Sequence, residues 1–356
     1  MTIRVVHWGV GATGKLGLRG VIGHPELELV GLGVARPENV GRDAGDCCDQ
    51  PDTGVVATSS TDDLLALKPD CLSYFGAGSN DLEAGLAIVE PFLEAGVNVV
   101  TTSLSPLIFP HALDPAIRDR VEGACRRGGS TLFATGIEPG FASDLLPFNL
   151  MTIVEELDVM HIQEIADYSN YPVEYVQREV FGFGKPMDHE PLLFQGDRIA
   201  KTWKGVVTGM AKDLGIALDD VTVDVGKAPA HQDLTTAFGA VEKGTVGAIR
   251  FALNGVAGGR TVIIMEHINY LHDDIAPEWG RGGAGKGTVY RVKITGQPDL
   301  VCELVLSSVG GRLATAMRAI NAIPLMKDAR TGILEPLEVP ARPSGRVRGV
   351  ATAGKR

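Results

Sequence analysis

The sequence predicts an α/β protein in which a doubly wound parallel sheet is followed by a second α+β domain with a mainly antiparallel open sheet. Two observations support this fold class. Short apolar runs alternate with helical segments as far as about residue 135, which is typical of parallel strands joined by crossover helices. From residue 157 onward, apolar and polar residues alternate along longer runs, which is typical of an antiparallel sheet.

The first strand–turn–helix unit contains a glycine motif. An apolar run over residues 3–6 predicts a buried strand, and residues 16–22 predict a helix. The G-x-G-x-x-G sequence between them indicates a Rossmann-type dinucleotide site, because its glycines permit a tight turn, approach of a pyrophosphate and close helix packing. A glycine-rich turn without a ligand is the alternative. The residues predicted to bind the cofactor here are Gly9, Gly11, Ala12, Thr13 and Gly14.

The end of the second predicted strand, over residues 27–34, bears on the choice of nucleotide. Arg36 follows this strand, 22 residues after Gly14. An NAD site usually has an acid near this position for the ribose 2′-hydroxyl, whereas an arginine accommodates the 2′-phosphate of NADP. Arg36 therefore favours NADP(H). Because Glu38 is close by, NAD is still possible, and Arg36 could be a solvated loop residue.

Four further strands complete the predicted first domain. Their ranges are 54–58, 70–75, 97–102 and 130–134, with helices predicted over 62–67, 81–95 and 115–127. Ligands of parallel sheets bind beyond the carboxyl ends of the strands, so the residues that follow them should line one crevice with the glycine turn. The residues predicted to contact the cofactor there are Gly76, Ala77, Thr101 and Thr102.

The segment over residues 135–141 contains a candidate proton-transfer group. Two glycines and a proline impose an unusual backbone path on it. Glu138 precedes Pro139, so it is expected to be extended, and it is the only acid between Glu122 and Asp144. A carboxylate beside a nicotinamide could transfer a proton, and a capping or salt-bridge role is the alternative.

The second domain is predicted to carry seven strands and two helices. The strand ranges are 157–168, 221–225, 234–241, 246–253, 261–270, 289–294 and 300–306, and the helix ranges are 173–181 and 204–214. Alternation places Glu266 on one face of its strand and His267 on the other. His267 is a candidate substrate contact or proton donor, and Tyr168 is a candidate pocket wall. A structural histidine and an ordinary core tyrosine are the alternatives.

The remaining segments complete the predicted organisation. Residues 281–287 are glycine-rich and predict a hairpin loop or lid, and residues 312–323 predict a helix that returns to the first domain. The last residues are rich in proline, glycine and arginine and predict an extended or disordered tail. The expected divisions are 1–145 for the dinucleotide-binding domain, 146–310 for the substrate and dimerisation domain, 311–338 for the returning segment and 339–356 for the tail.

Composition narrows the class of protein. The net charge of −11 argues against nucleic acid or an anionic membrane as the main partner. No apolar run reaches the ~18 residues of a membrane span, and no signal peptide is expected. The five cysteines show no zinc-site spacing, so we expect reduced thiols, no metal site and a cytoplasmic protein.

Three segments resemble the family of 2,4-diaminopentanoate dehydrogenases and native amine dehydrogenases, relatives of dihydrodipicolinate reductase. They are residues 9–14, residues 35–45, and residues 135–141 together with 144–147. The resemblance covers nearly the whole chain through Pro324, and the last of these segments is its most specific part. It implies a homodimeric NAD(P)H enzyme that interconverts a small-molecule amine with a ketone plus ammonia.

The chain departs from the family pattern at three places. Family members carry a glutamate shortly after the Thr-Thr of the fifth strand, but here residues 103–105 are Ser-Leu-Ser. The family commonly has asparagine where this chain has Glu138, and our hypothesis is that the carboxylate has moved there from about Ser105. The reductases' paired histidines with a following lysine are missing, so a role in lysine biosynthesis is not expected. The alternatives are a ketone or aldehyde reductase and a catalytically inactive NADPH-binding sensor.

Overall fold

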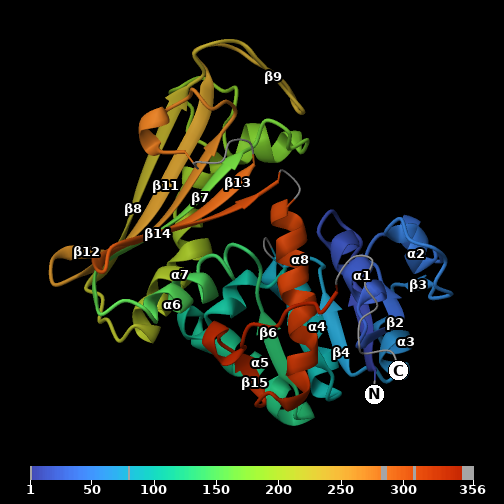
Figure 1. The fold of residues 1–356 in the computed structure, drawn as a ribbon. Coiled ribbons are helices and arrows are strands. Elements are labelled where there is room, and N and C mark those ends of the chain that lie inside the picture. The colour runs from blue at the N-terminus through green and yellow to red at the C-terminus, as the bar shows by residue number, and fades with distance from the viewer. Residues whose placement is uncertain (1, 79–80, 282–286, 308–309, 347–356) are drawn as a thin grey trace. The chain divides into compact units, whose positions relative to one another are not determined.

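The structure is a computed structural model that describes residues 2–78, 81–281, 287–307 and 310–346 (Figure 1). The chain forms two compact units, one of residues 1–141 and 312–356 and the other of residues 142–311. These divisions lie a few residues from the expected ones. The helix near residue 312 belongs to the first unit, so that unit is built from both ends of the chain.

A seven-stranded sheet forms the centre of the first unit. Its strands lie in the order β15-β6-β5-β4-β1-β2-β3, and every pairing is parallel. The doubly wound parallel sheet is therefore confirmed, with an edge strand near the end of the chain that the sequence does not predict. The strands are β1 (Ile3–Trp8), β2 (Leu27–Gly33), β3 (Ala57–Thr58), β4 (Cys71–Tyr74), β5 (Asn98–Thr101), β6 (Thr131–Ala134) and β15 (Gly332–Leu334).

Helices cover both faces of this sheet. They are α1 (Gly14–Gly23), α2 (Ala44–Cys47), α3 (Thr61–Ala66), α4 (Leu82–Glu94), α5 (Pro115–Gly128) and α8 (Gly310–Ala322). The chain runs from β1 through α1 to β2 in one direction, and through α4 and α5 to β6 in the other. Because crossovers are right-handed, the two directions place their helices on opposite faces. α8 lies on the α1 face, since Val21 of α1 shares a hydrophobic cluster with Ala316 and Ile320.

A six-stranded sheet forms the second unit, in the order β14-β13-β7-β12-β11-β8. Four of its pairings are antiparallel and one, between β7 and β12, is parallel, so the mainly antiparallel sheet is confirmed. The elements are α6 (Leu145–Met151), β7 (Glu156–Asp167), α7 (Arg198–Asp213), β8 (Asp220–Pro229), β11 (Val246–Ala257), β12 (Arg260–Tyr270), β13 (Thr288–Gln297) and β14 (Leu300–Leu306).

One element predicted for this unit is wrong, and another is helical as predicted but of a different helix type. The strand expected over 234–241 is a hairpin of β9 (Leu234–Thr236) and β10 (Gly239–Val241), closed where the Thr236 hydroxyl donates to the Gly239 carbonyl at 2.6 Å. The helix expected over 173–181 is a short π-helical turn, Val176–Val180. Its buried Gln177 donates from the side-chain amide to the Tyr168 carbonyl at 2.6 Å, so a tertiary contact holds this turn.

Several predicted segments fall partly outside the described residues. Of the expected loop over 281–287, residues 282–286 lie outside them, and the guanidinium of Arg281 lies 4.2 Å from the centre of the Tyr270 ring. Residues 347–356 of the expected tail also lie outside them. Residues 339–346 form no helix or strand, but Arg342 pairs with Glu26 at 2.7 Å.

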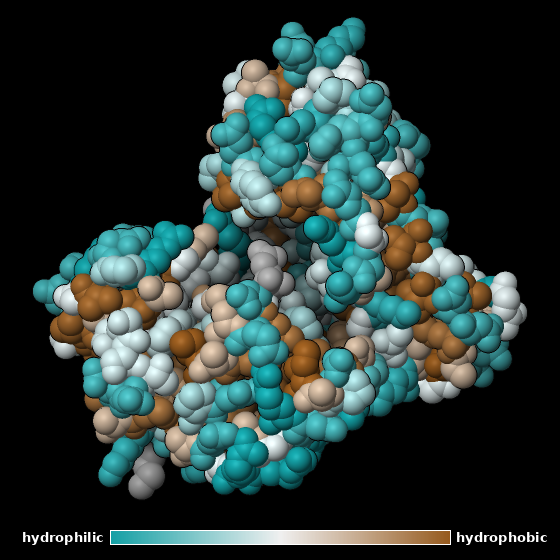
Figure 2. Space-filling view, turned by 180° about the vertical axis from the view of Figure 1, so that it is seen from behind, coloured by the Kyte–Doolittle hydropathy of each residue, from teal (hydrophilic) through white to brown (hydrophobic). Residues whose placement is uncertain are grey.

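The surface is of mixed polarity. On the face that Figure 2 shows, hydrophobic residues lie scattered among hydrophilic ones and form no continuous belt. Within the part of the chain that the structure describes, no helix combines the length and the hydropathy needed to cross a bilayer.

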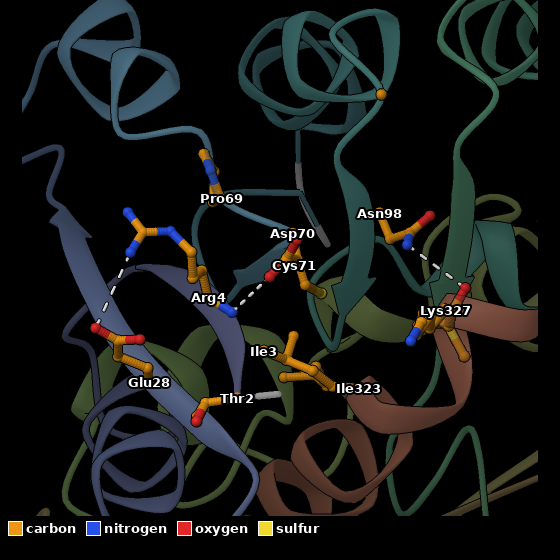
Figure 3. Close-up of a pocket in the computed structure, with 12 residues that line it drawn as sticks. Thr2, Ile3, Arg4, Glu28, Pro69, Asp70, Cys71, Asn98, Ile323 and Lys327 are labelled. Carbon is orange, nitrogen blue, oxygen red and sulfur yellow. Dashed lines mark hydrogen bonds and ion pairs between the residues drawn. The ribbon is translucent and has the colours of Figure 1, made fainter.

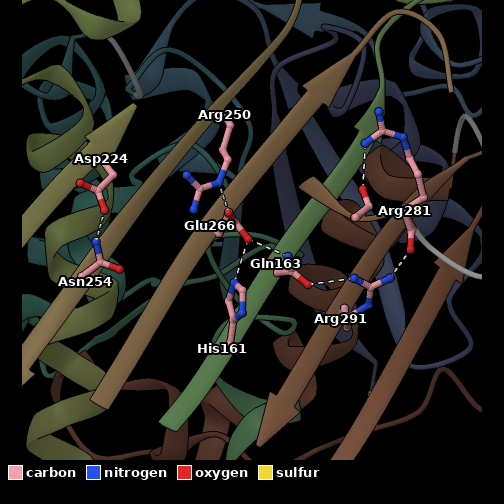
Figure 4. Close-up of polar contacts among 9 residues, drawn as sticks. His161, Gln163, Asp224, Arg250, Asn254, Glu266, Arg281 and Arg291 are labelled. Carbon is pink, nitrogen blue, oxygen red and sulfur yellow. Dashed lines mark hydrogen bonds and ion pairs between the residues drawn. The ribbon is translucent and has the colours of Figure 1, made fainter. Parts of the chain in front are cut away.

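Glu266 anchors the centre of the second sheet. It is only 3% exposed, and it accepts hydrogen bonds from Gln163 of β7 at 2.6 Å and from Arg250 of β11, while His161 Nε2 lies 2.8 Å from it (Figure 4). Burial alone would raise the pKa of Glu266, but these donors outweigh it and lower the pKa to about 2. The carboxylate therefore joins three neighbouring strands, and His267, the next residue, lies on the opposite face as predicted.

Replacing this carboxylate should cost considerably more stability than replacing an edge carboxylate of the same sheet. In Glu266→Gln the new amide N–H groups face donors, and we expect the free energy of unfolding to fall by about 2–4 kcal/mol. The matched control is Glu303→Gln, whose partner Arg291 lies 2.7 Å away at the sheet edge and whose loss should cost at most about 1 kcal/mol. Urea unfolding measures both, and equal losses would contradict the anchoring role.

Candidate active site

The glycine turn over residues 9–14 connects β1 to α1 at the carboxyl edge of the first sheet. The strand order changes direction between β1 and β4, and this is where ligands of open α/β sheets bind. Gly9 has φ +106°, and a Cβ there would lie 2.4 Å from the carbonyl oxygen of Phe75. A Cβ on Gly14 would lie 2.3 Å from the carbonyl oxygen of Gly9. The first and third glycines therefore let the turn, the helix and β4 approach one another.

Gly11, the middle glycine of the motif, faces open space instead. A Cβ built there would meet no atom of the described residues within 4 Å. The next residue but one, Thr13, precedes α1, and its side chain makes no capping hydrogen bond within the described chain. The first backbone N–H groups of a helix lack intrahelical partners and attract anions. The turn thus fits a dinucleotide, with a backbone surface that a pyrophosphate can approach.

His7 supports this turn from within the sheet. It is fully buried, and its Nε2 lies 2.9 Å from the Gly9 carbonyl oxygen while its Nδ1 lies 3.2 Å from the Ser73 hydroxyl of β4. Burial lowers the pKa of His7 to about 4, so the ring is neutral near pH 7. The sequence reasoning missed this residue. The signal was available, because a histidine within an apolar strand needs a buried hydrogen-bond partner.

Arg36 lies at the carboxyl end of β2, the strand beside β1. It directly precedes a short 3₁₀ helix, Pro37–Asn39, and both Arg36 and Glu38 are exposed. If a pyrophosphate binds at the end of β1, the ribose next to the adenine lies toward β2, which is the position that the fold assigns to the nucleotide-selecting residue. The structure therefore leaves the Arg36 guanidinium accessible to a 2′-phosphate.

The residues after β4 and β5 shape the same edge of the sheet. The Tyr74 hydroxyl donates to the Ala77 carbonyl at 2.7 Å, and burial raises the pKa of Tyr74 to about 12. Thr101 is fully buried, and its hydroxyl accepts from the Ser103 N–H at 3.0 Å. Thr101 therefore holds the backbone in place, whereas Gly76 and Thr102 are partly accessible. Contacts of these residues with a cofactor stay a prediction.

Glu138 lies in a compact turn after β6. The Phe141 N–H donates to the Gly136 carbonyl at 3.0 Å, and the Thr135 N–H donates to Thr101 of β5 at 2.9 Å. A Cβ on Gly140, which has φ +143°, would lie 2.3 Å from the Gly136 carbonyl oxygen, so only glycine closes this turn. Glu138 is half-buried at the carboxyl edge of the sheet, three strands and roughly 14 Å from β1.

In the second unit, His267 belongs to a buried cluster on the face of the sheet that α7 covers. Its ring stacks on Phe251 with centroids 4.6 Å apart and lies 5.0 Å from Trp203 of α7. Its Nδ1 lies 3.8 Å from an oxygen of Glu164, which is its register partner on β7. The sequence reasoning missed Glu164, although its place among apolar residues of an alternating strand was a signal.

Tyr168 follows β7 and forms part of an aromatic cluster in the second unit. Its ring meets Phe181 edge-on at 5.0 Å and Tyr171 at 5.8 Å. Such packing fits a pocket wall and also an ordinary core position. The pocket role of Tyr168 therefore stays a prediction.

A cavity of about 580 Å³ lies at the opposite edge of the first sheet (Figure 3). Ile3 and Cys71, which begin β1 and β4, contribute to its lining, so it lies at the amino ends of the strands. Its charged groups are of both signs, and Arg4 lies 4.0 Å from Glu28 across it. This cavity is therefore separate from the glycine turn, and its balanced lining gives no preference for a phosphate group.

Comparison with known proteins identifies the family. A family model described as the 2,4-diaminopentanoate dehydrogenase C-terminal domain matches residues 141–351. An amine dehydrogenase of Streptomyces virginiae is 33% identical over 96% of this chain and 97% of its own length. The chain belongs to the 2,4-diaminopentanoate dehydrogenase family. The family resemblance found in the sequence is thereby confirmed, and the protein is an oxidoreductase of the dehydrogenase type.

A second curated relative and a solved structure are also similar to this chain. A 2,4-diaminopentanoate dehydrogenase of Acetoanaerobium sticklandii is 22% identical over 95% of this chain and 93% of its own. The solved structure of an amine dehydrogenase from Mycobacterium smegmatis has the same fold, with a TM-score of 0.77 and 21% identity over 98% of both chains. The Rossmann-type fold is thus common to the chain and this solved structure.

Two alanine substitutions in the glycine turn should separate binding from folding. Gly11→Ala adds a methyl group in open space, so we expect unchanged or slightly higher stability but at least about tenfold weaker NADPH binding. Gly14→Ala forces its methyl group onto the Gly9 carbonyl, and we expect a loss of about 1–3 kcal/mol in the free energy of unfolding. Calorimetric titration and thermal unfolding measure the two effects. Unimpaired NADPH binding by Gly11→Ala would contradict the assignment of the site.

Proposed function

We propose that this dehydrogenase is an NADPH-dependent amine dehydrogenase, which transfers hydride to the carbon of a C=N bond formed from a ketone and ammonia. The observation that carries the proposal is that the turn over residues 135–141 holds Glu138 at the same edge of the sheet as the glycine turn. The names of the relatives support the reaction class. The overall reaction is ketone, ammonia, NADPH and a proton to amine, NADP⁺ and water.

The first unit offers binding groups for each part of the nucleotide. NADPH, when bound, supplies the hydride. The glycine turn and the start of α1 would hold the pyrophosphate, and Arg36 would pair with the 2′-phosphate. Gly76, Ala77 and Thr102, which follow β4 and β5, would then lie along the nicotinamide half of the crevice.

Glu138 would carry the proton that the reaction consumes. Loss of the carbonyl oxygen as water requires protonation, and a protonated C=N nitrogen takes up the π electron pair when hydride adds to the carbon. General acid–base groups of this kind contribute about 10²–10⁴ in rate. In the second unit, His267 and Tyr168 would orient the substrate, and Glu164 would hold the His267 ring through the contact at 3.8 Å.

A ketone or aldehyde reductase is the second candidate. Residues 103–105 carry no carboxylate where the family resemblance implies one, and this favours a reaction without nitrogen chemistry. Ammonium dependence separates the two candidates. Oxidation of NADPH by a ketone panel should require ammonium if the proposal holds, whereas turnover without ammonium supports the reductase. Tight NADPH binding without any turnover would indicate the sensor instead.

Glu138→Gln should remove most turnover and spare the cofactor. The amide keeps the size of the side chain but cannot carry the proton, so we expect kcat to fall by about 10²–10⁴ with an unchanged Kd for NADPH. Glu94→Gln is the control of equal chemistry and should keep full activity, because Glu94 of α4 forms an exposed ion pair with Arg127 of α5. Equal kcat for Glu138→Gln and the wild-type enzyme would rule out the assigned role.

Arg36→Ala should change the nucleotide preference. Removing the guanidinium loses charge-assisted hydrogen bonds to the 2′-phosphate, so KM for NADPH should rise about tenfold or more while KM for NADH stays the same. Arg42→Ala is the neighbouring control, because this arginine already donates to Asn39 at 3.2 Å. Initial rates with both nucleotides decide the matter, and parallel changes in both KM values would count against NADP(H) selection by Arg36.

The expected homodimer stays a prediction. Its test is the molar mass of the purified protein in solution, measured by light scattering over a range of concentrations.

A further inference from the structure

Three metal-ligating side chains gather in the second unit, on residues that the proposed reaction does not use. The Asp274 carboxylate has one oxygen 3.5 Å from His272 Nδ1 and 3.9 Å from His231 Nε2. All three ligating atoms lie within 4.8 Å of one another. The two imidazole rings have centroids 6.0 Å apart. This cluster shares no residue with the candidate active-site residues Glu138, Glu164 and His267.

The backbone explains why residues so distant in sequence meet. His231 lies in the connection after β8, and His272 lies in the segment after β12. β8 and β12 flank β11 in the sheet. The Ala230 N–H donates to Thr245 at 2.8 Å, and the Leu271 N–H donates to Gly247 at 3.0 Å. Both connections are thus attached to the start of β11, immediately before the two histidines.

The chemistry of the cluster suits a cation. The Asp274 N–H donates to His272 Nδ1 at 3.3 Å, a long hydrogen bond that an ion bound at this nitrogen would displace. Residues 272–278 contain three acids and no lysine or arginine, which gives the segment a negative charge. The Asp274 side chain is 73% exposed, so an ion can reach the site and keep water ligands.

We propose that His231, His272 and Asp274 bind a divalent transition-metal ion, with Zn²⁺ as the expected class. Two ligands at 2.0–2.1 Å from a tetrahedral Zn²⁺ lie roughly 3.4 Å apart. The two distances to Asp274 are close to this value, so small side-chain rotations complete the site. Two imidazoles favour Zn²⁺, Co²⁺ or Ni²⁺ over Mg²⁺ and Ca²⁺, which prefer oxygen ligands.

The bound ion would join the β8–β9 connection to the segment after β12. The backbone hydrogen bonds described above attach each connection to the start of β11 separately and do not join the two connections to each other. The site is structural in kind, because the ion would bind the folded second unit and shift unfolding to higher temperature. It does not depend on the proposed amine dehydrogenase activity.

The test uses the full-length protein after treatment with a chelator. Titration with ZnCl₂ should show that one equivalent of Zn²⁺ binds. Addition of CoCl₂ should produce the visible absorption band of Co²⁺ in a coordination site of low symmetry. His231→Ala and Asp274→Asn should each weaken Zn²⁺ binding by at least about tenfold and remove the rise in Tm that Zn²⁺ causes. Asp273→Asn is the matched control, since it removes the same charge from the next residue and should bind Zn²⁺ within about twofold of the wild type.

Three results would overturn the proposal. The first is a double variant, His231→Ala with His272→Ala, that binds Zn²⁺ as tightly as the wild type. The second is equal weakening by Asp273→Asn and Asp274→Asn, which would indicate attraction by the general negative charge of the segment. The third is that the wild-type protein shows no saturable binding of one equivalent of Zn²⁺. All substituted side chains are at least partly exposed, and circular dichroism confirms that each variant is folded.

Discussion

The contact between the Gly9 carbonyl and Gly14 is the constraint on which the nucleotide site depends. A Cβ at Gly14 would come within 2.3 Å of that carbonyl oxygen, so α1 can begin beside β1 only if this residue is glycine. The same carbonyl lies 2.9 Å from His7 Nε2, which attaches the turn to the buried face of the sheet. With the turn and the helix held in this way, the accessible backbone at Gly11 has a defined place at the carboxyl edge.

The carboxyl ends of the other strands of the first unit lie at the same edge of the sheet. Parallel pairing brings Arg36 after β2 and Glu138 after β6 to one side of the sheet, although about a hundred residues separate them in sequence. The 135–141 turn then holds Glu138 through the hydrogen bond that the Thr135 N–H donates to β5 and the one that the Phe141 N–H donates to Gly136. The pairing of the strands and the turn after β6 therefore determine where Glu138 lies, and its side chain contributes the carboxylate.

The second unit separates its polar groups by face. Neighbouring residues Glu266 and His267 point to opposite sides of β12, and each has a buried environment of its own. Glu266 is surrounded by donors from β7 and β11, which hold its pKa near 2. His267 lies among the rings of Phe251 and Trp203 beside Glu164. A sheet held rigid by the hydrogen bonds of Glu266 can hold the cluster around His267 in a fixed geometry.

Local pattern determined much of this protein from the sequence alone. The glycine motif, the alternation around Glu266 and His267, and the strand–helix periodicity of the first 135 residues depend on near neighbours, so they predicted the parallel sheet, the mainly antiparallel second sheet and the family. Tertiary contacts decided the rest. β15 forms because β6 has a free edge, the strand expected over 234–241 folds into a hairpin, and Glu164 meets His267 through pairing across about a hundred residues. Sequence periodicity reports which face a residue occupies, whereas only the folded chain decides which distant residue shares that face.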